Sequence, residues 1–278
     1  AEAARKKQIN TIEEFFGTKL AQTLVSDGGL LKDKVDLVIA NNVIAHVPDI
    51  NDFMMGINYI LKENGYLSCE FPHLLNLLKK NQFDTIYHEH YSYLSLKVFK
   101  RIANFNGLKI VDVEEIPTHG GSLRVWLVKK NNPVNENSSV KEIIKKEEKA
   151  GLESWDIYDE FRKNIEKIKY QLLEFLLEQK RKGKRVYAYG AAAKGNTLLN
   201  YAGIRNDLIV AVADKAKSKQ GKFLPGSHIP IISYEELQEC DVDFLILLPW
   251  NLIHELKVQL KNYKLVTAIP ELCLISLD

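Results

Sequence analysis

The sequence of 278 residues contains few cysteines, almost no net charge and no long hydrophobic run. Its three cysteines, Cys69, Cys240 and Cys273, lie far apart and form no CxxC pair, which excludes a disulfide framework and a zinc knuckle. The 38 basic and 36 acidic residues give a net charge of +2, which argues against a nucleic-acid-binding protein with a broad basic surface. No apolar run approaches the length of a membrane span, and the N-terminus lacks a signal-peptide pattern. We therefore expect a cytoplasmic protein with no nucleic-acid or membrane partner, in which 46% hydrophobic residues supply a sizeable core.

The first half of the chain alternates between segments that favour strands and segments that favour helices. Strands are predicted from apolar and β-branched runs at 35–40, 66–71, 108–113 and 123–128. Helices are predicted from apolar spacing at 50–63 and 95–106, and Gly65 is the expected C-cap of the first. This alternation predicts an α/β sheet and leaves room for an antiparallel strand at its edge.

The second half follows a linker-like segment at 131–139. Apolar residues spaced by three and four between 158 and 176 predict one long structural helix. Beyond Gly183 the pattern alternates again, which predicts a second, smaller α/β unit. Its strands are expected at 185–189, 208–213, 244–248 and 265–268, and its helices from 196 onward and at 254–260.

Small residues at 190–195 lie between the strand at 185–189 and the helix that follows. A loop of this kind lets the backbone approach a phosphate, whose charge the helix N-terminus favours. Tight packing of strand against helix explains Gly190 and Gly195 about as well, but the Lys194 ammonium within the loop suits a phosphate. Asp214, at the end of the next strand, either binds a ribose or is a solvated strand end.

The densest cluster of polar and aromatic residues lies at 87–93 and includes His88, Glu89 and His90. Two histidines that flank a carboxylate are typical of a partial metal site or of acid–base chemistry, in which Glu89 orients an imidazole. Acid–base chemistry is the better functional interpretation, because the sequence identifies no third metal ligand. From these residues alone, a packed loop with histidines bonded to the backbone is an equally good structural interpretation.

Polar residues also follow the strand at 35–40, at the end where open α/β sheets bind their ligands. Asn41 and Asn42 offer amide donors and acceptors there, and His46 can reach the same crevice. Further along, His119 precedes two glycines that free the backbone for close approach, although such a turn is common.

The order of these motifs resembles that of a known family. The strand at 35–40, the segment that follows it and the helix at 50–63 are similar to the back half of class I S-adenosylmethionine-dependent methyltransferases. Together with the later motifs, nearly the whole chain resembles the sugar C-methyltransferases, which act on nucleotide-linked keto-deoxysugars. The motifs that carry the resemblance are NNVIAHVPD (41–49), YHEH (87–90), THGGSLR (118–124), YGAAAKG (189–195), LPGSHIP (224–230) and PWN (249–251).

The resemblance implies a fold and a reaction. Residues 1–131 are then the C-terminal portion of a Rossmann-like class I methyltransferase domain, and residues 132–278 are a long helix with a smaller Rossmann-like nucleotide-sugar-binding domain. A base removes the proton beside the sugar ketone, and the enolate attacks the methyl group of the cofactor, S-adenosylmethionine. The implied base is His90, with Tyr87 and Glu89 as its partners.

The resemblance also assigns residues to three binding sites. Those that match the sugar pocket are Asn42, His46 and His119. Those that match the cofactor site are Asn41 and Asn42. Those that match the site of the nucleotide diphosphate are Gly190, Lys194, Gly195 and Asn196, with His228 and Trp250 as weaker candidates.

Members of this family begin with parts that the sequence lacks. They carry a cysteine-rich zinc-binding domain and then a strand with a glycine-rich cofactor loop, and nothing before Val35 matches either. We therefore expect the chain to begin inside the methyltransferase fold, with zinc only in a missing N-terminal domain, and a missing segment or a partner chain to complete the fold. Two alternatives stay open: a nucleotide-sugar-binding module without activity and, less favoured, an NAD-dependent enzyme that uses residues 185–214.

Overall fold

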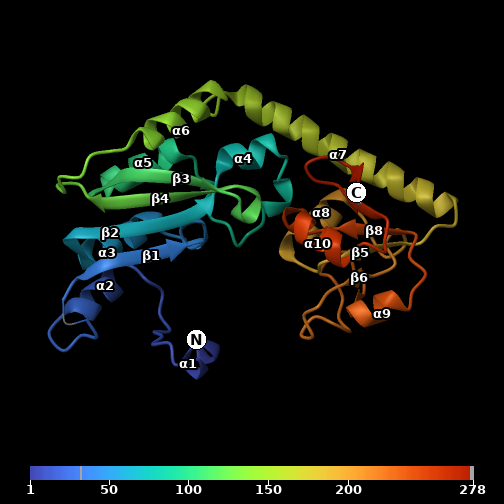
Figure 1. Ribbon diagram of the computed structural model, residues 1–278, viewed down its shortest axis with the longest axis horizontal. Helices are drawn as coiled ribbons and strands as arrows, with labels where there is room; N and C mark the ends of the chain where they lie inside the picture. Colours follow the sequence, from blue (N-terminus) through green and yellow to red (C-terminus); the bar gives the residue numbers. More distant parts are fainter. Residues whose placement is uncertain (32, 276–278) are drawn as a thin grey trace. The chain divides into compact units, whose positions relative to one another are not determined.

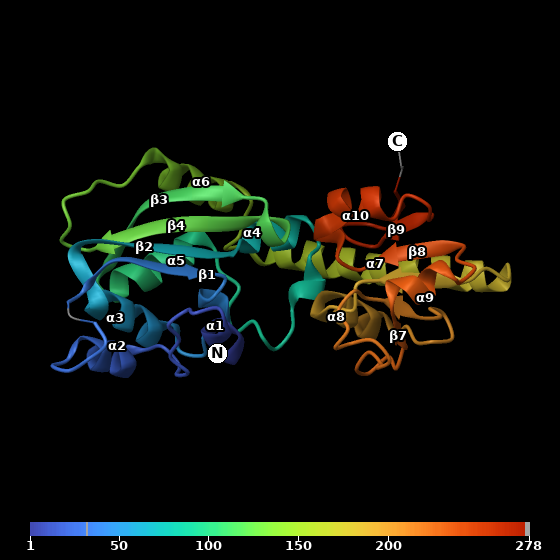
Figure 2. The ribbon, with the colours of Figure 1, turned by 60° about the horizontal axis from the view of Figure 1, so that its bottom comes forward.

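The computed structural model describes residues 1–31 and 33–275, which form two compact units (Figures 1 and 2). The two units are interleaved along the chain. Unit 1 comprises Ala1–His73, Tyr91–Pro117 and Ser122–Lys149, and unit 2 comprises Leu74–His90, Thr118–Gly121 and Ala150–Asp278. Compactness does not test a division of function, so the expected boundary after residue 131 stays a prediction.

Unit 1 contains a four-stranded sheet in the order β1-β2-β4-β3. Its strands are β1 (Val35–Asn41), β2 (Leu61–Pro72), β3 (Leu108–Ile116) and β4 (Ser122–Lys129). β1 and β2 are parallel, whereas β4 pairs antiparallel with both β2 and β3. The expected α/β sheet is confirmed, but its antiparallel strand lies inside the sheet rather than at the edge.

The helices of unit 1 are α1 (Glu2–Lys6), α2 (Thr18–Val25), α3 (Ile50–Ile60), α5 (Leu96–Phe105) and α6 (Ser138–Lys149), with the short 3-10 helix η1 (Ile44–His46) after β1. Of these, α3, α5, α6 and η1 share one apolar core with the sheet. α3, α5 and α6 contribute Met54, Phe99 and Val140 to the same core cluster, together with Leu67 of β2. These four side chains are fully buried.

The helix expected at 50–63 ends earlier, at Ile60. Leu61 is extended, with φ −75° and ψ 136°, and it is fully buried where it pairs with Val35 of β1. Gly65 therefore lies within β2, and its assignment as a helix C-cap is wrong. A Cβ atom at Gly65 would lie 2.9 Å from the Leu61 side chain and 3.0 Å from the Val35 carbonyl oxygen, so this glycine is needed for close approach of the two strands.

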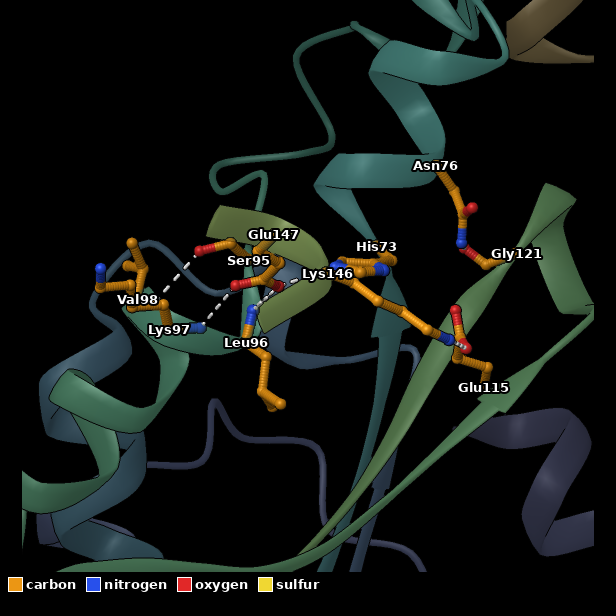
Figure 3. A network of polar contacts seen from close by, with 10 residues as sticks. All are labelled: His73, Asn76, Ser95, Leu96, Lys97, Val98, Glu115, Gly121, Lys146 and Glu147. Carbon is orange, nitrogen blue, oxygen red and sulfur yellow. Dashed lines mark hydrogen bonds and ion pairs between the residues drawn. The ribbon is translucent and has the colours of Figure 1, made fainter. Parts of the chain in front are cut away.

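A buried polar cluster joins α5 and α6 to the end of β2 (Figure 3). The Glu147 carboxylate accepts hydrogen bonds from the backbone N–H groups of Leu96 (2.6 Å) and Lys97 (3.0 Å), which belong to the first turn of α5. His73 Nε2 lies 2.8 Å from the same carboxylate, and both side chains are nearly inaccessible to solvent. A negative charge at a helix N-terminus is favourable, so Glu147 anchors α6 to α5.

Unit 2 contains a six-stranded sheet in the order β10-β9-β8-β5-β6-β7. Its strands are β5 (Val186–Tyr189), β6 (Val212–Ala213), β7 (Ile231–Ile232), β8 (Phe244–Leu247), β9 (Leu265–Thr267) and β10 (Cys273–Leu274). All pairs are parallel except β9 with β10. Counted from β5, the strand order is that of dinucleotide-binding Rossmann sheets, 3-2-1-4-5-6. The expected second α/β unit is confirmed.

The helices of unit 2 are α4 (Leu74–Lys79), α7 (Trp155–Arg181), α8 (Ala193–Ala202), α9 (Tyr234–Gln238) and α10 (Ile253–Gln259), with the 3-10 helices η2 (Phe83–Thr85), η3 (Thr118–Gly120) and η4 (Trp250–Leu252). Of these, α7 and α8 cover one face of the sheet, and α9 and α10 cover the other. Val186 and Ala188 of β5 pack with α7 and α8, whereas the alternate residues Tyr187 and Tyr189 pack in the cluster that contains α9 and α10. The long helix expected around 158–176 is confirmed as α7 (Figure 1).

Two predicted boundaries in unit 2 are wrong. The helix expected from residue 196 begins at Ala193, so Lys194 and Gly195 lie in its first turn rather than in a loop. The strand expected at 208–213 is shorter in the structure and comprises only Val212–Ala213.

None of the helices formed by residues 1–31 and 33–275 is both long and apolar enough to span a membrane.

Candidate active site

The strand order of unit 2 determines where a ligand is expected to bind. In open parallel sheets, ligands bind beyond the carboxyl ends of the two neighbouring strands at which the chain order reverses. These are β5 and β8, which pair with each other. The segment after β5 leads into the first turn of α8 and contains Lys194, and the segment after β8 contains Trp250 and Asn251.

The indole ring of Trp250 is the centre of a polar cluster at this position. The Lys194 ammonium lies over the ring, 4.8 Å from its centroid, and donates to Oδ1 of Asn251 (3.3 Å). At the edge of the ring, Trp250 Nε1 donates a hydrogen bond of 2.7 Å to Oδ2 of Asp84. A cation over an indole face and a carboxylate at its N–H both match the charge distribution of the ring.

Asp84 belongs to η2 and is completely buried. Burial raises the pKa of its carboxyl group to about 6, although the Trp250 hydrogen bond and the Lys194 charge act in the opposite direction. Burial also lowers the pKa of Lys194, while the Asp84 charge raises it. The two ionisable groups are therefore electrostatic partners that contact one indole ring, Lys194 at its face and Asp84 at its edge.

The turn formed by Gly120 and Gly121 is part of the same cluster. Gly120 has a φ of +92°, and a Cβ atom there would lie 2.5 Å from the Trp250 ring and 2.7 Å from Nε2 of Gln82. Its carbonyl oxygen accepts hydrogen bonds from Lys80 Nζ and Gln82 Nε2, both at 2.9 Å. His119, in the same short helix, is exposed and also has a positive φ of 53°. The glycines thus let this turn pack directly against Trp250.

His90 ends a tight turn that begins at Tyr87. Its backbone N–H bonds to the Tyr87 carbonyl oxygen (3.0 Å), and the two rings lie 4.6 Å apart. His90 Nδ1 lies 2.7 Å from the Thr85 carbonyl oxygen. A carbonyl oxygen can only accept, so Nδ1 carries a proton and Nε2 is the nitrogen that can act as a base. Thr85 follows Asp84 directly, so the turn of His90 is bonded to the helix that bears Asp84.

The other two polar residues of this turn, His88 and Glu89, are exposed. The segment is a turn rather than a strand, so the geometry in which His88 and His90 would share one face does not arise. Within the described part of the chain, no group of three or more His, Cys, Asp or Glu side chains is arranged to hold a metal ion.

The loop after β5 is partly occupied by the protein itself. Asp214 Oδ2 accepts from the backbone N–H of Ala191 (2.8 Å), and its Oδ1 accepts from that of Ala216 (2.8 Å). Gly190 has a φ of +93° and its N–H bonds to the Ala213 carbonyl oxygen (2.8 Å). Asp214 therefore braces the loop and is not a solvated strand end, whereas ribose binding by this residue stays a prediction.

The first turn of α8 remains suited to an anion. Ala192 occupies the N-cap position and has no side-chain acceptor, so the N–H groups of Lys194 and Gly195 are not capped by it. The side-chain oxygen of Asn196 is buried and, among the described residues, has no hydrogen-bond partner, but as an acceptor it does not itself favour an anion. The remaining candidate, His228, is exposed in a loop whose Pro225 carbonyl oxygen accepts from the Asn200 side chain of α8 (3.0 Å).

Asn41, Asn42 and His46 lie in unit 1, at the carboxyl end of β1. Asn41 is the last residue of the strand, and Asn42 has a φ of +56° with its N–H bonded to the Glu70 carbonyl oxygen (2.7 Å). Both asparagines are exposed. His46 belongs to η1 and lines a cavity of about 460 Å³ in unit 1.

Aromatic and acidic side chains line this cavity. Among them are Phe15, Phe16, Phe53 and Glu14. Phe15 is 96% exposed, an unusual state for a phenylalanine in a folded unit. Nothing in the sequence patterns predicted that residues 14–16 would line a cavity with His46.

The 3-10 helix that contains His46 is hydrogen-bonded to Tyr91, the residue that follows His90. Tyr91 and Ser92 donate their backbone N–H groups to the Ala45 carbonyl oxygen, at 2.8 Å and 3.2 Å. The structure brings Lys194, Trp250 and Gly120 together in unit 2; the sequence patterns had not linked Gly120 with the other two. Asp84 was not predicted: one aspartate in the apolar context of 83–86 carries no recognisable sequence signal.

Comparisons with known proteins agree with this description. Residues 117–270 match the family described as the C-methyltransferase C-terminal domain, and residues 3–113 match a methyltransferase domain. The chain is 33% identical over 283 residues to the C-methyltransferase NovU of Streptomyces niveus, an alignment that covers 100% of this chain and 66% of that protein. The chain thus spans slightly less than two thirds of the length of this relative.

Solved methyltransferase structures resemble the chain only distantly. A SAM-dependent methyltransferase of Thermotoga maritima aligns with a TM-score of 0.35 and 17% identity, covering 47% of this chain and 69% of its own. The magnesium protoporphyrin IX methyltransferase of Synechocystis, solved with bound SAH, aligns with a TM-score of 0.29 and 21% identity, covering 40% and 48%. Scores of this size carry no argument, so we base the function on the family and the site.

Proposed function

We propose, from the premise that this chain belongs to the C-methyltransferase C-terminal domain family, that it forms the larger part of an S-adenosylmethionine-dependent enzyme that methylates a carbon of a nucleotide-linked keto-deoxysugar. The observation that carries the proposal is the His90 imidazole, whose Nδ1 is bound to a carbonyl oxygen, which makes Nε2 the basic nitrogen of the ring. The Rossmann strand order of unit 2 and the Lys194 ammonium support binding of the nucleotide diphosphate.

The proposed reaction begins with proton transfer from carbon. A proton beside a ketone is acidic enough for an imidazole base when the developing oxyanion receives a hydrogen bond. His90 Nε2 takes this proton, and the electron pair of the C–H bond becomes the enolate. Tyr87 supplies a hydroxyl donor beside His90, and Glu89 is the acidic group that offsets the imidazolium charge. By the family resemblance, His46 and His119 are also proposed to contact the sugar.

The residues of unit 1 fit a bound cofactor. When bound, S-adenosylmethionine supplies the electrophilic methyl group for the enolate carbon. Asn41 and Asn42, at the carboxyl end of β1, would hold its polar end. The cavity lined by Phe15 and Phe16, with Glu14 among its carboxylates, has the flat apolar walls and the hydrogen-bond acceptor that an adenosine requires.

The diphosphate of the substrate is proposed to bind at the first turn of α8. Its negative charge suits the Lys194 ammonium and the backbone N–H groups of Lys194 and Gly195. The side-chain NH2 group of Asn196 is proposed as a further donor, and Gly190 has the positive φ that the loop requires. Because the chain spans 66% of its relative, we also propose that a further segment or a partner chain completes the cofactor site.

The three free cysteines, Cys69, Cys240 and Cys273, favour a cytoplasmic location, because the cytoplasm keeps thiols reduced.

Exchange of the substrate proton tests the base without requiring methyl transfer. In heavy water, the wild-type chain is expected to exchange the proton beside the ketone of a nucleotide-linked keto-deoxysugar, as followed by NMR. His90→Gln should slow this exchange by about a hundredfold or more, the typical contribution of a general base. The matched control is His88→Gln, in the same turn but exposed, which should leave exchange unchanged.

Equal loss in the two variants would contradict the assignment of His90.

A second candidate function is a nucleotide-sugar-binding module without activity, which the self-contained anion site of unit 2 favours. Calorimetric titration with S-adenosylmethionine distinguishes the two: binding supports the enzyme, whereas absence of binding together with nucleotide-sugar binding supports the module.

A further inference from the structure

Unit 2 buries a carboxylate beneath the position proposed for an anionic ligand. Asp84 is completely buried, and among the described residues its Oδ1 atom makes no hydrogen bond of good geometry, although the backbone N–H groups of Asp84 and Thr85 lower the pKa of the carboxyl group. A carboxylate that only served to hold Trp250 would need one oxygen, and a neutral amide would serve equally well. Burying a full charge is costly, so the charge itself calls for an explanation.

The partner of this charge is the cation proposed to bind phosphate. Lys194 lies over the face of the Trp250 ring, and Asp84 accepts a hydrogen bond from the edge of the same ring, so the three groups form one cluster. The positive charge of Lys194 lowers the pKa of the Asp84 carboxyl group. In the absence of ligand, Asp84 therefore supplies the negative charge that keeps the half-buried ammonium in place.

We propose that Asp84 is a positioning residue that acts as the internal counter-charge of Lys194, holding the ammonium over Trp250 until a diphosphate binds and takes over that role. This proposal rests on the proposed function, because it assumes that the diphosphate of the substrate binds at Lys194. It assigns a role to a residue that no motif singled out.

We expect the protein to take up a proton when the ligand binds. When a diphosphate binds beside Lys194, its negative charge disfavours the ionised form of Asp84, which already has a pKa raised to about 6 by burial. The Asp84 carboxylate then takes one proton from solvent and becomes a neutral acid that can still accept the Trp250 hydrogen bond. Binding is thus coupled to proton uptake, and affinity rises as the pH falls toward 6.

The test uses UDP-glucose as the probe, because its diphosphate does not titrate between about pH 5.5 and 8. Calorimetry at neutral pH in two buffers of different ionisation enthalpy measures both affinity and proton uptake. The wild type is expected to take up a substantial fraction of one proton per UDP-glucose. Asp84→Asn keeps the shape of the side chain, and it should bind UDP-glucose on the order of tenfold more tightly with less proton uptake, because the competing charge is gone.

Lys194→Met identifies the site. It should weaken UDP-glucose binding by itself, and in the double variant it should abolish the gain in affinity that Asp84→Asn produces alone. If Lys194→Met weakens binding but Asp84→Asn leaves affinity and proton uptake as in the wild type, then the counter-charge role is overturned and the proposed anion site stands. If UDP-glucose binds with equal affinity to the wild type and Lys194→Met, or binds to neither, both the anion site and this inference fall.

A second measurement does not depend on the folding of a variant. Difference infrared spectroscopy of the wild type detects the carbonyl band of a protonated buried carboxyl group. This band is expected to grow when UDP-glucose binds at neutral pH. Binding without any such band would overturn the proposal even if Asp84→Asn failed to fold, because a purely structural Asp84 would not change its protonation.

Discussion

The residue at position 120 shows how one missing side chain can determine the environment of another. Gly120 has a left-handed φ of +92°, and the Trp250 ring occupies the space where a Cβ would be. The same glycine presents its carbonyl oxygen to Lys80 and Gln82. The HGG sequence at 119–121 is a common kind of turn, but here it forms one wall of the space that the Trp250 indole occupies.

Gly120→Ala is expected to disturb that wall, and Gly203→Ala is its matched control. Gly203 also has a left-handed φ, +71°, but open space surrounds the position of its Cβ. Each substitution should cost about 1 kcal/mol in backbone strain. Gly120→Ala should cost about 1 to 3 kcal/mol more, because its methyl group overlaps Trp250. Urea unfolding gives the free energies, and Trp250 fluorescence should shift in Gly120→Ala alone; equal costs and unshifted fluorescence would contradict this packing.

Sequence reasoning at the scale of residues depended on short motifs that could be recognised. Lys194 and Trp250 were singled out from short motifs, and they do lie together. Asp84 and Phe15 were missed because each acts through partners far away in the chain, which periodicity and local spacing do not encode. The roles assigned to His90, Asn42 and the other site residues stay predictions.

At the scale of elements, α5 begins where the chain supplies a remote carboxylate. Ser95 is its N-cap and accepts from Val98 N–H (3.2 Å), while Glu147 of α6 accepts from the N–H groups of the first two helical residues. A helix leaves its first N–H groups without internal partners, so this pair of caps satisfies several of them. α6 is thereby fixed to the start of α5 (Figure 3).

Removing this remote cap should loosen α5 and α6 together. Glu147→Ala leaves buried N–H groups and His73 without their acceptor, which is expected to cost about 3 kcal/mol. Glu148→Ala is the control, because this neighbour makes only a surface ion pair with Lys97 and should cost less than about 1 kcal/mol. Urea unfolding and amide hydrogen exchange of the first turn of α5 provide the measurements. Similar costs for the two variants would show that the buried contacts contribute little.

The elements predicted best were those with a long, regular pattern. α7 and β1 follow directly from apolar spacing and from a β-branched run. The helix predicted at 50–63 was too long because Leu61 has a better alternative, a fully buried position beside Val35 in the sheet. That choice depends on a strand elsewhere in the chain, so the local sequence could not reveal it.

At the scale of the whole molecule, β1 is the end strand of the unit 1 sheet. Its residues alternate: Val38 and Ala40 pack in the core, whereas Leu37 and Ile39 are 48% and 64% exposed. An end strand with exposed apolar side chains is a template for pairing with another chain. We expect this chain, by itself, to associate through β1 as its concentration increases.

Ile39→Lys is expected to reduce that association, because a charge at an end strand opposes pairing. Val258→Lys, at a 75% exposed position on α10, is the matched control for adding a lysine to an apolar surface. Sedimentation velocity over a concentration series should show less association for Ile39→Lys and no change for Val258→Lys. An equal reduction in both variants would assign the effect to net charge rather than to β1.

The interleaving of the two units has a consequence for how such proteins can recombine. Asp84 and Trp250 are 166 positions apart and fall on opposite sides of the junction between the two matched family segments, yet they share one hydrogen bond. A chimera that joined the front of this chain to the back of a relative at that junction would combine an Asp84 from one parent with an indole from the other. A chimera keeps both partners of this hydrogen bond from one parent only if the short segment 74–90 travels with the C-terminal half.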